Sequence, residues 1–438
     1  MSSWNNSSWQ YFKADQQPEW IDIAALENVK STLESLPSLV FSGETRRLKE
    51  ELKEVNRGNA FILQAGDCSE SFADCNGPKI HNYLRVLLQM ALIISHKTNK
   101  KIIKIGRIAG QYAKPRSSNY ELVDGQKIHA YRGDMVNNHF PSKECRMPDP
   151  KRLLEGYYRS AATLNLIRAF TQGGYTEIKH LNDWKVHSFA NEISQMEDFI
   201  ELENELSISL AEINSCTQSI LNDEIYISHE GLLLDYEEAF TRIDTITGDF
   251  YNTAAHSLWI GDRTRNSSGA HAEYFSGIGN PVGIKVGSSC DLDDLVELIK
   301  KINSQNEEGK VILILRLGVK NIDKYFPKII TKIKSENLNV IWSCDPMHGN
   351  TFTYGSYKVR DIDDILIELK SFFSICKSCN VIPGGVHLEI TSGHVTECIG
   401  GLSGLSLDDL ASNYVSKVDP RLNAAQALET AFEFSKLI

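Results

Sequence analysis

Residues 61–68 read FILQAGDC, an apolar run that ends in glycine and is followed at once by an acid and a thiol. Seven further apolar runs share this design, each with a charged or metal-binding residue directly after or close to its end. They are KIIKIG before Arg107, IYIS before His229 and Glu230, SLWIG before Asp262 and Arg263, VGI before Lys285, VILIL before Arg316, NVIWS before Asp345 and His348, and GVHL before Glu389.

Eight short apolar runs that each deliver a polar group at the C-terminal end are typical of a (β/α)8 or TIM barrel. This α/β fold carries its active site at the C-terminal mouth of the barrel, on the ends of the strands. All but the first two runs are joined by a longer stretch with a helical pattern. The sequence therefore predicts a TIM barrel whose mouth holds the groups named above.

Apolar residues at helical spacing predict helices in residues 21–36, 291–302 and 361–376. Pro420 favours a further helix that starts there, because proline suits a first helical turn. Residues 1–57 precede the first run, and we interpret them as a helical extension that packs on the barrel or on a partner subunit. Residues 58–438 are assigned to the barrel, with inserted helices at about 186–222.

The composition limits the possible function classes. The chain has 438 residues, 42% of them hydrophobic, and a net charge of −11, which argues against a nucleic-acid or anionic membrane surface. Its first ten residues lack the basic and apolar regions of a signal peptide, and no run reaches the ~18 apolar residues of a membrane span. The nine cysteines are scattered and odd in number, which favours reduced thiols and a cytoplasmic location.

Four potential metal ligands follow apolar runs or precede the last helix. In a closed barrel the first, seventh and eighth runs are neighbours, so Cys68, His348 and Glu389 converge. Asp419 supplies a second carboxylate. A thiolate, an imidazole and two carboxylates suit Mn, Fe, Co or Zn better than Mg. We therefore predict a divalent metal site.

Basic residues are candidates to bind phosphate, because arginine grips it with a two-pronged fork and lysine as a point charge. These candidates are Arg107, Lys114, Arg116, Arg132, Arg263, Lys285 and Arg316. Lys285 and Arg316 lie within or at the end of apolar runs, where an unpaired charge costs several kcal/mol. Either a fixed carboxylate or an anionic ligand must neutralise them, and we favour the ligand.

Ten motifs together resemble class II 3-deoxy-D-arabino-heptulosonate 7-phosphate (DAHP) synthase, the first enzyme of the shikimate pathway. They span about residues 61–423 in order, with a further family-like stretch, PSLVFSGE, in the extension. The motifs are QAGDCSESF, GRIAGQYAKPRSS, YRGDMVN, SHEGLLLDYE, WIGDRTR, NPVGIKVG, WSCDPMHGNT, GGVHLEIT, VTECIGG and DPRLN. The chain departs from the family pattern at Asp262, where many members have Glu, after Arg316 at Leu317 and Val319, and at Ser392–Gly393–His394.

The resemblance implies a role for each group of residues. It implies a divalent metal, Mn most of all, on Cys68, His348, Glu389 and Asp419. It implies phosphoenolpyruvate binding by Arg107, Asp262, Arg263, Lys285 and Arg316. It assigns erythrose 4-phosphate to Lys114, Pro115, Arg116 and Ser117. Lys114 and His348 are the candidates to move protons.

The resemblance also implies the reaction. Phosphoenolpyruvate, erythrose 4-phosphate and water would give DAHP and phosphate in a metal-dependent aldol-type step. Homo-oligomers and aromatic amino acid effectors are further expectations from the family. Three alternatives stay open: a variant that uses an aminated sugar in secondary metabolism, a metal-dependent aldolase with an enolate donor, and a non-catalytic barrel that senses phosphosugars.

Overall fold

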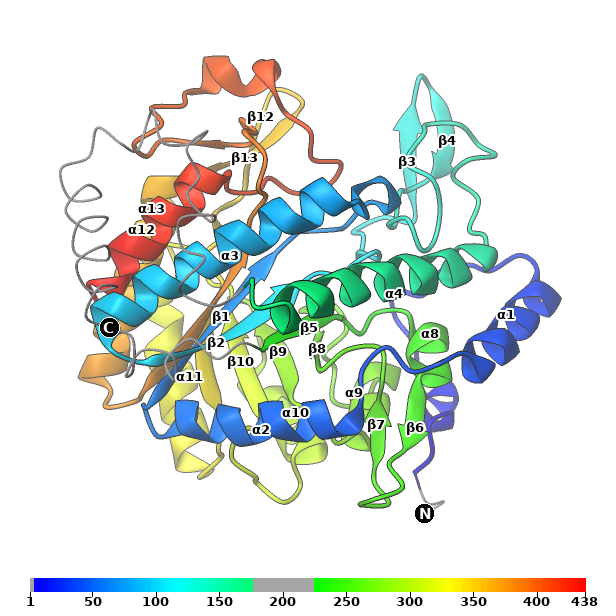
Figure 1. The fold of residues 1–438 in the computed structure, drawn as a ribbon, viewed down its shortest axis with the longest axis horizontal. Coiled ribbons are helices and arrows are strands. Elements are labelled where there is room, and N and C mark those ends of the chain that lie inside the picture. Colours follow the sequence, from blue (N-terminus) through cyan, green and yellow to red (C-terminus); the bar gives the residue numbers. More distant parts are fainter. Residues whose placement is uncertain (1–3, 176–223) are drawn as a thin grey trace.

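The computed structural model describes residues 4–175 and 224–438 (Figure 1). The inserted helices predicted at about 186–222 lie outside these residues. None of the helices within the described ranges is long and apolar enough to cross a membrane.

Eight parallel strands close into a barrel, and each contains all or most of one of the eight apolar runs. The strands are β1 (Ala60–Gly66), β2 (Lys101–Arg107), β5 (Ile225–Glu230), β8 (Ser257–Ile260), β9 (Val282–Val286), β10 (Val311–Leu315), β11 (Ile341–Cys344) and β14 (Pro383–Glu389). Each strand pairs with the next in this order, and β14 returns to β1. Strand β8 stops one residue before the end of its run, at Ile260, and β11 starts two residues into its run, at Ile341. The predicted TIM barrel is confirmed.

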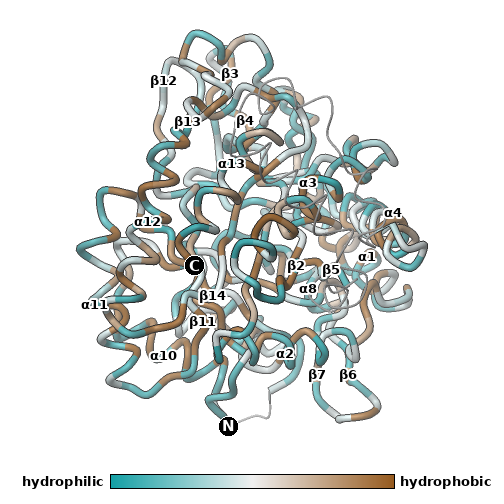
Figure 2. Tube along the Cα trace, turned by 60° about the vertical axis from the view of Figure 1, so that its left-hand side comes forward, coloured by the Kyte–Doolittle hydropathy of each residue, from teal (hydrophilic) through white to brown (hydrophobic). Residues whose placement is uncertain are grey.

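Helices cover the outside of the barrel. They are α3 (Gly77–Thr98), α4 (Lys151–Gln172), α8 (Leu234–Ala239), α9 (Ala270–Ser276), α10 (Leu292–Ile302), α11 (Ile322–Ser335), α12 (Ile362–Ser378) and α13 (Ala424–Ser435). In Figure 2 the tubes of α11 and α12 alternate between hydrophobic and hydrophilic residues, as expected where one side faces the strands.

The first two strands are also joined by a helix, which the sequence pattern did not reveal. The 22-residue α3 packs on β1 and β2 and also touches α4 and α13. Its second half buries residues on nearly every side, including the consecutive run 90–95. A helix covered all round has no single apolar stripe, so the pattern that marks surface helices is weak there.

The helices predicted at 291–302 and 361–376 are confirmed as α10 and α12, each capped by an aspartate side chain at its start. The start predicted at Pro420 is wrong. Helix α13 begins at Ala424, where Asn423 and Gln426 form a reciprocal cap. Pro420 instead belongs to the loop that carries Asp419, and its carbonyl accepts a hydrogen bond from Arg360.

The N-terminal extension contains η1 (Ser8–Tyr11), α1 (Ile23–Ser35) and α2 (Ser42–Asn56). Helix α2 lies across one end of the barrel (Figure 1). Leu48, Leu52 and Val55 pack there against interior strand residues such as Ile62 and Ile341. Helix α1 packs against α4 and α8. One end of the barrel is thereby closed, and the opposite mouth stays open for polar groups.

Shorter elements surround that mouth and its flanks. They are the hairpins β3 (Tyr120–Val123) with β4 (Gln126–His129) and β6 (Thr241–Ile243) with β7 (Phe250–Asn252), the sheet of β12 (Phe352–Tyr354), β13 (Tyr357–Asp361) and β15 (Cys398–Ile399), and the 3-10 turns η2 (Phe72–Asp74), η5 (His348–Asn350) and η6 (Leu407–Ser412).

Candidate active site

The strand register brings two oppositely charged side chains together at the mouth. Gly66 of β1 pairs with Arg107 of β2 on one side and with Glu389 of β14 on the other. A side chain on Gly66 would have its Cβ 2.5 Å from the Arg107 carbonyl oxygen. Glycine therefore leaves room for the Arg107 backbone at this level. The Arg107 side chain donates from Nη2 to Glu389 Oε1 at 3.0 Å.

A cavity of about 330 Å³ opens above this level. The thirteen residues to which the family resemblance assigns a role all line it: Cys68, Arg107, Lys114, Pro115, Arg116, Ser117, Asp262, Arg263, Lys285, Arg316, His348, Glu389 and Asp419. Gln111, Glu230, Trp259, Gly261, Thr351 and Lys358 complete the lining. The structure thus gathers groups from all eight strand ends and from distant loops into one cavity.

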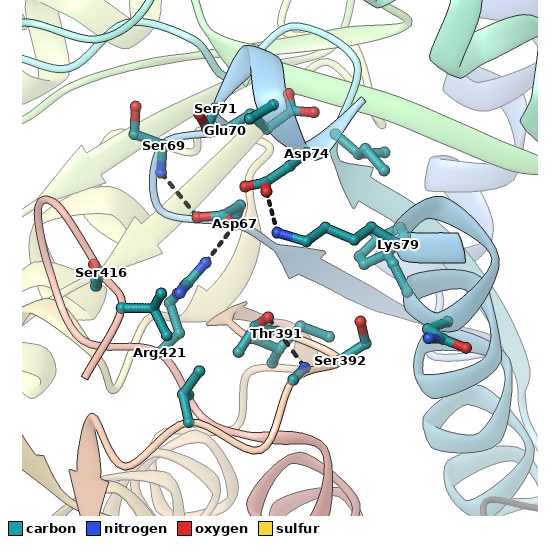
Figure 3. Close-up of a pocket in the computed structure, with 18 of the residues that line it drawn as sticks. Asp67, Ser69, Glu70, Ser71, Asp74, Lys79, Thr391, Ser392, Ser416 and Arg421 are labelled. Carbon is teal, nitrogen blue, oxygen red and sulfur yellow. Dashed lines mark hydrogen bonds and ion pairs between the residues drawn. The ribbon is translucent and has the colours of Figure 1, made fainter. Parts of the chain in front are cut away.

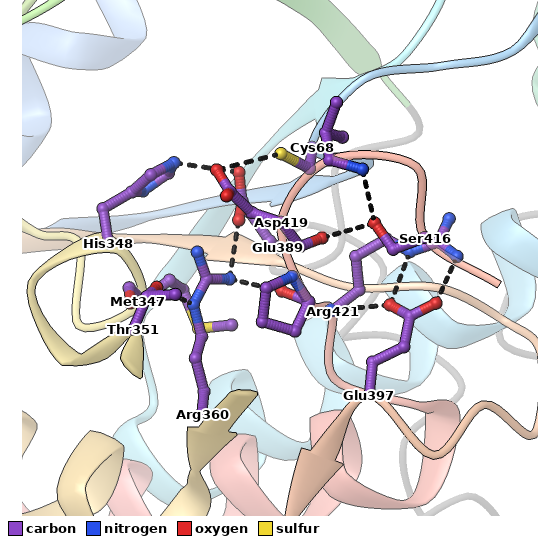
Figure 4. A network of polar contacts seen from close by, with 12 residues as sticks. Cys68, Met347, His348, Thr351, Arg360, Glu389, Glu397, Ser416, Asp419 and Arg421 are labelled. Atoms are coloured by element: carbon purple, nitrogen blue, oxygen red, sulfur yellow. Dashed lines mark hydrogen bonds and ion pairs between the residues drawn. The ribbon is translucent and has the colours of Figure 1, made fainter. Parts of the chain in front are cut away.

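Three of the four predicted metal ligands form a tight buried cluster. Donor atoms of Cys68, Glu389 and Asp419 all lie within 4.8 Å of one another. His348, on η5 directly after β11, reaches the same place, with Nε2 3.1 Å from Glu389 Oε1. Figure 4 shows the four side chains converging from separate segments of the chain.

Cations surround this cluster. Lys114 Nζ contacts both Cys68 Sγ and Asp419 Oδ2, and Lys358 Nζ lies 2.6 Å from Asp419 Oδ1. Burial opposes the ionisation of Asp419, but Lys114 holds the pKa of this carboxyl well below its usual value. Burial raises the pKa of the Cys68 thiol to about 12, and Glu389 adds to the shift. Without a metal the Asp419 carboxylate is thus ionised and paired with lysines, while the Cys68 thiol keeps its proton.

His348 belongs to a buried chain of charged groups. Its Nδ1 lies 2.7 Å from Asp345 Oδ2, and the same oxygen accepts a hydrogen bond from Lys285 Nζ at 3.0 Å. Of the two partners that the sequence allowed for Lys285, a fixed carboxylate or an anionic ligand, the carboxylate is present as Asp345. Burial lowers the pKa of Lys285 despite this partner. Lys285 is held in place by Asp345 and still lines the cavity.

Two arginines bring positive charge into the cavity. Within residues 4–175 and 224–438, neither Arg263 nor Arg316 pairs with a carboxylate. Arg132, a phosphate candidate from the sequence, is not in the cavity lining. Its guanidinium donates to the Gln16 carbonyl at 3.0 Å and to Asn119. Arg132 is therefore a structural residue of its loop, whereas Arg263 and Arg316 come from strand ends.

The loop 114–117 is supported by the N-terminal extension. The backbone N–H of Arg116 donates to Gln16 Oε1 at 2.8 Å, and that of Lys114 to the Arg132 carbonyl at 2.9 Å. Glu70 holds the preceding turn, because its carboxylate accepts backbone hydrogen bonds from residues 109–111 at 2.7–3.0 Å.

Arg107 is oriented by a chain of hydrogen bonds inside the barrel. Ser228 Oγ donates to the Gly106 carbonyl, so it accepts from Gln64 Nε2 at 2.9 Å. Gln64 Oε1 then faces Nδ1 of His387 at 2.9 Å, which makes Nδ1 the protonated nitrogen. His387 Nε2 is left as an acceptor for Arg107 Nη1 at 3.0 Å.

Glu230 is a cavity residue that the sequence identified only as a strand end. Its Oε1 is buried and has no hydrogen-bond partner in the part of the chain that the structure describes. Burial raises its pKa above the usual value, against the pull of Lys285 and Lys114. Its place after an apolar run could have identified it as a site residue. Lys358, on β13, follows no such run, so no sequence pattern marked it.

Comparison with known proteins fits this geometry. A model of the class-II DAHP synthetase family matches residues 4–435. The chain belongs to this family. It is 41% identical over 430 residues to phospho-2-dehydro-3-deoxyheptonate aldolase of Streptomyces coelicolor, covering 97% of this chain and 95% of that protein. It is also 41% identical over 449 residues to the Neurospora crassa protein of the same name, covering 98% and 93%.

A solved structure of phospho-2-dehydro-3-deoxyheptonate aldolase from Francisella tularensis SCHU S4 matches with a TM-score of 0.51 and 15% identity, covering 94% of this chain and 96% of that one. This likeness supports the barrel fold alone. Of the departures from the family pattern, Asp262 accepts hydrogen bonds from Gly287 N and Arg265 Nε. Ser392 and Gly393 line a second cavity, which shares Arg107 with the first.

Proposed function

We propose that this chain condenses phosphoenolpyruvate with erythrose 4-phosphate and water to give DAHP and phosphate, the first step of the shikimate pathway. Membership of the class-II DAHP synthetase family supports this reaction. The observation in the site that carries it is the meeting of Arg263 and Arg316 with a buried donor cluster in one cavity. Two phosphorylated substrates require such a concentration of positive charge in an acidic protein.

The donor set fits a divalent transition metal. A thiol, two carboxylates and an imidazole meet at one buried point, and a lysine ammonium lies among them. We propose that Cys68, His348, Glu389 and Asp419 hold the metal, with Mn as our expectation and Co, Fe or Zn as alternatives. When bound, such an ion acts as a Lewis acid on the aldehyde of erythrose 4-phosphate.

The basic strand ends bind phosphoenolpyruvate in this proposal. Arg107, Arg263, Lys285 and Arg316 hold its phosphate and carboxylate, and Asp262 fixes the loop beside Arg263. Two-pronged arginine contacts set both position and orientation of an anion. Carbon 3 of the bound enolpyruvate then attacks the aldehyde carbon, water adds at carbon 2, and phosphate leaves. Because the site holds both substrates with their reacting carbons aligned, less entropy is lost on the way to the transition state.

Erythrose 4-phosphate occupies the side of the cavity formed by Lys114, Pro115, Arg116 and Ser117. The backbone bond from Arg116 to Gln16 supports this loop, so that its groups are held ready for the phosphate. We propose that Lys114 moves the proton at the aldehyde oxygen. His348 was the other candidate, but a ligating Nε2 has no lone pair left for that proton, and its Nδ1 faces Asp345. Glu230, with its raised pKa and with Oε1 unpartnered among the described residues, takes the proton from the attacking water.

We further propose a cytoplasmic homo-oligomer that responds to aromatic amino acids, on the strength of the family alone. The aminated-sugar variant differs from the proposed enzyme in its aldose. A sensor barrel differs in having no turnover. The test is to supply phosphoenolpyruvate with either erythrose 4-phosphate or an aminated tetrose phosphate, and to identify the product by mass spectrometry. DAHP as the main product supports the proposal. An amino product, or none, would refute it.

A further inference from the structure

One arginine joins the two loops that carry Cys68 and Asp419. Arg421 Nη1 donates to Asp67 Oδ2 at 2.7 Å, although the two residues are 354 positions apart in the chain. Asp67 immediately precedes Cys68, and Arg421 lies two residues after Asp419. A single side chain thus ties the end of β1 to the loop before α13.

Glu397 fixes the guanidinium of Arg421 from the other side (Figure 4). Arg421 donates from Nε to Oε2 at 3.0 Å and from Nη2 to Oε1 at 2.8 Å, and its backbone N–H donates to Oε2 at 2.8 Å. The Glu397 side chain is fully buried. Such a two-pronged contact sets direction as well as distance. Arg421 therefore has one orientation available, and that orientation points Nη1 at Asp67.

Arg360 holds the same loop from the barrel side. It donates from Nη1 to Glu389 Oε2 at 2.6 Å and also to the Pro420 carbonyl. Asp419 is followed directly by Pro420, whose carbonyl accepts from Arg360, and then by Arg421, which is bound to Glu397. The two arginines therefore hold the chain immediately after Asp419, whose Oδ2 lies 3.7 Å from Cys68 Sγ.

Arg421 does not reach the substrates directly. It lines a second cavity, of about 550 Å³, together with Asp67, Thr391 and Ser392 (Figure 3). Cys68 and Asp419 line the first cavity, and Arg421 does not. The bond between Arg421 and Asp67 therefore lies behind the donor cluster. Any effect of Arg421 on the reaction must pass through the residues that it positions.

We infer that Arg421 is a positioning residue for the candidate metal centre, where it sets the distance between Cys68 and Asp419 through Asp67 and Glu397. This inference rests on the metal site proposed above. Residues that orient metal ligands commonly change metal affinity by roughly 10–100-fold when they are replaced. The expected effect is therefore on metal affinity, and activity should fall only as a consequence.

The test uses Co²⁺ as the probe, because a cobalt–thiolate bond gives a charge-transfer absorption band. Metal-free protein is titrated with Co²⁺ against a competing chelator. Arg421→Gln should bind Co²⁺ roughly 10–100-fold more weakly than the unchanged protein. Arg421→Lys should recover little of this loss, because lysine cannot form the fork with Glu397. The control is Arg168→Gln, which removes the contacts of Arg168 Nη2 with both Glu44 oxygens; neither residue lines the first cavity, so Co²⁺ affinity should stay unchanged.

Arg421→Gln leaves Glu397 buried without its partner, so the double variant Arg421→Gln/Glu397→Gln is measured beside it, with folding checked by circular dichroism. Asp67→Asn keeps the fork and should still weaken Co²⁺ binding by more than about threefold. If every folded variant binds Co²⁺ within about threefold of the unchanged protein, the inference is wrong. The unchanged protein should show a cobalt–thiolate band, and Cys68→Ser should abolish it. If the band is absent, or survives in Cys68→Ser, the proposed metal site is wrong, and the inference about Arg421 is wrong with it.

Discussion

Arg107 and Glu389 meet across the bare backbone of Gly66, with Nη2 3.0 Å from Oε1. The three residues sit at one level of the barrel, on β2, β14 and β1. One group belongs to the proposed phosphoenolpyruvate site and the other to the proposed metal site. The ion pair therefore couples the positions of the two sites, at the level where Gly66 leaves room for the Arg107 backbone.

Gly66→Ala should disturb both sites at once. The added Cβ would lie 2.5 Å from the Arg107 carbonyl oxygen and 3.0 Å from its Cβ. Overpacking of this kind costs roughly 1–3 kcal/mol of unfolding free energy, measured here by denaturant titration. Gly77→Ala is the control, since nothing lies within 4 Å of the Cβ that this change would add and alanine favours the α3 helix. Equal stability and activity of the two variants would contradict this account of the register.

The two phosphate sites should separate by mutation. Arg316→Ala removes a cation with no carboxylate partner among the described residues, so kcat/KM for phosphoenolpyruvate should fall by about ten- to several-hundredfold. Its KM for erythrose 4-phosphate should change much less. Arg116→Ala should raise the erythrose 4-phosphate KM selectively. Steady-state kinetics of both variants with both substrates decide the matter. If both variants change the same kinetic constants, or if each changes the constant of the other substrate, the two phosphate sites are assigned wrongly.

Glu230→Gln should keep substrate binding and lose turnover. The amide has the same shape but cannot take a proton, and general base groups contribute roughly 10²–10⁴-fold to rate. We expect kcat to fall within that range. Calorimetric titration with phosphoenolpyruvate provides the control for binding. A variant that binds normally and keeps more than half of its turnover would exclude Glu230 from proton transfer.

Glu368 on α12 should give the protein a measurable pH-dependent stability. Its buried carboxylate accepts hydrogen bonds from Gly318 N at 2.8 Å and Asn350 Nδ2 at 2.7 Å. Burial raises its pKa to about 8 from an ordinary 4.5. Between these pH values the folded state holds a proton that the unfolded state releases, so the free energy of unfolding falls as pH rises.

Glu368→Gln removes this titration. Scanning calorimetry should show the melting temperature of the unchanged protein falling between about pH 6 and pH 8.5 more steeply than that of the variant. The difference between the two slopes should vanish below about pH 4.5, where Glu368 is protonated in both the folded and the unfolded state. Parallel curves over the whole range would mean that Glu368 titrates normally.

Much of this architecture was predictable because strand ends in a TIM barrel are also site positions. Apolar runs ending at Arg107, Lys285 and Glu389 located the strands and the cavity together. The sequence could not show that Asp345 neutralises Lys285, because that pairing depends on how β9 and β11 lie around β10. Lys358 comes from a hairpin whose path over the mouth is set by tertiary packing.

Two errors have a shared cause. Helix α3 was missed, and Arg132 was named a phosphate candidate, because the local sequence pattern does not show what covers a segment. Helix α3 is packed between the barrel and two other helices, so its apolar residues face several ways. The charge of Arg132 is satisfied by a carbonyl of the N-terminal extension and by Asn119.

The proposed condensation depends on a metal in the cavity that holds Cys68. Its most direct test is the release of phosphate from phosphoenolpyruvate in metal-defined buffer. We expect release only when erythrose 4-phosphate is present, loss of release after chelation, and recovery with Mn²⁺. A folded Cys68→Ser protein should lose nearly all of this turnover, since a hydroxyl is a far poorer ligand than a thiolate. Release that survives chelation, or a Cys68→Ser protein that keeps most of its rate, would contradict the account.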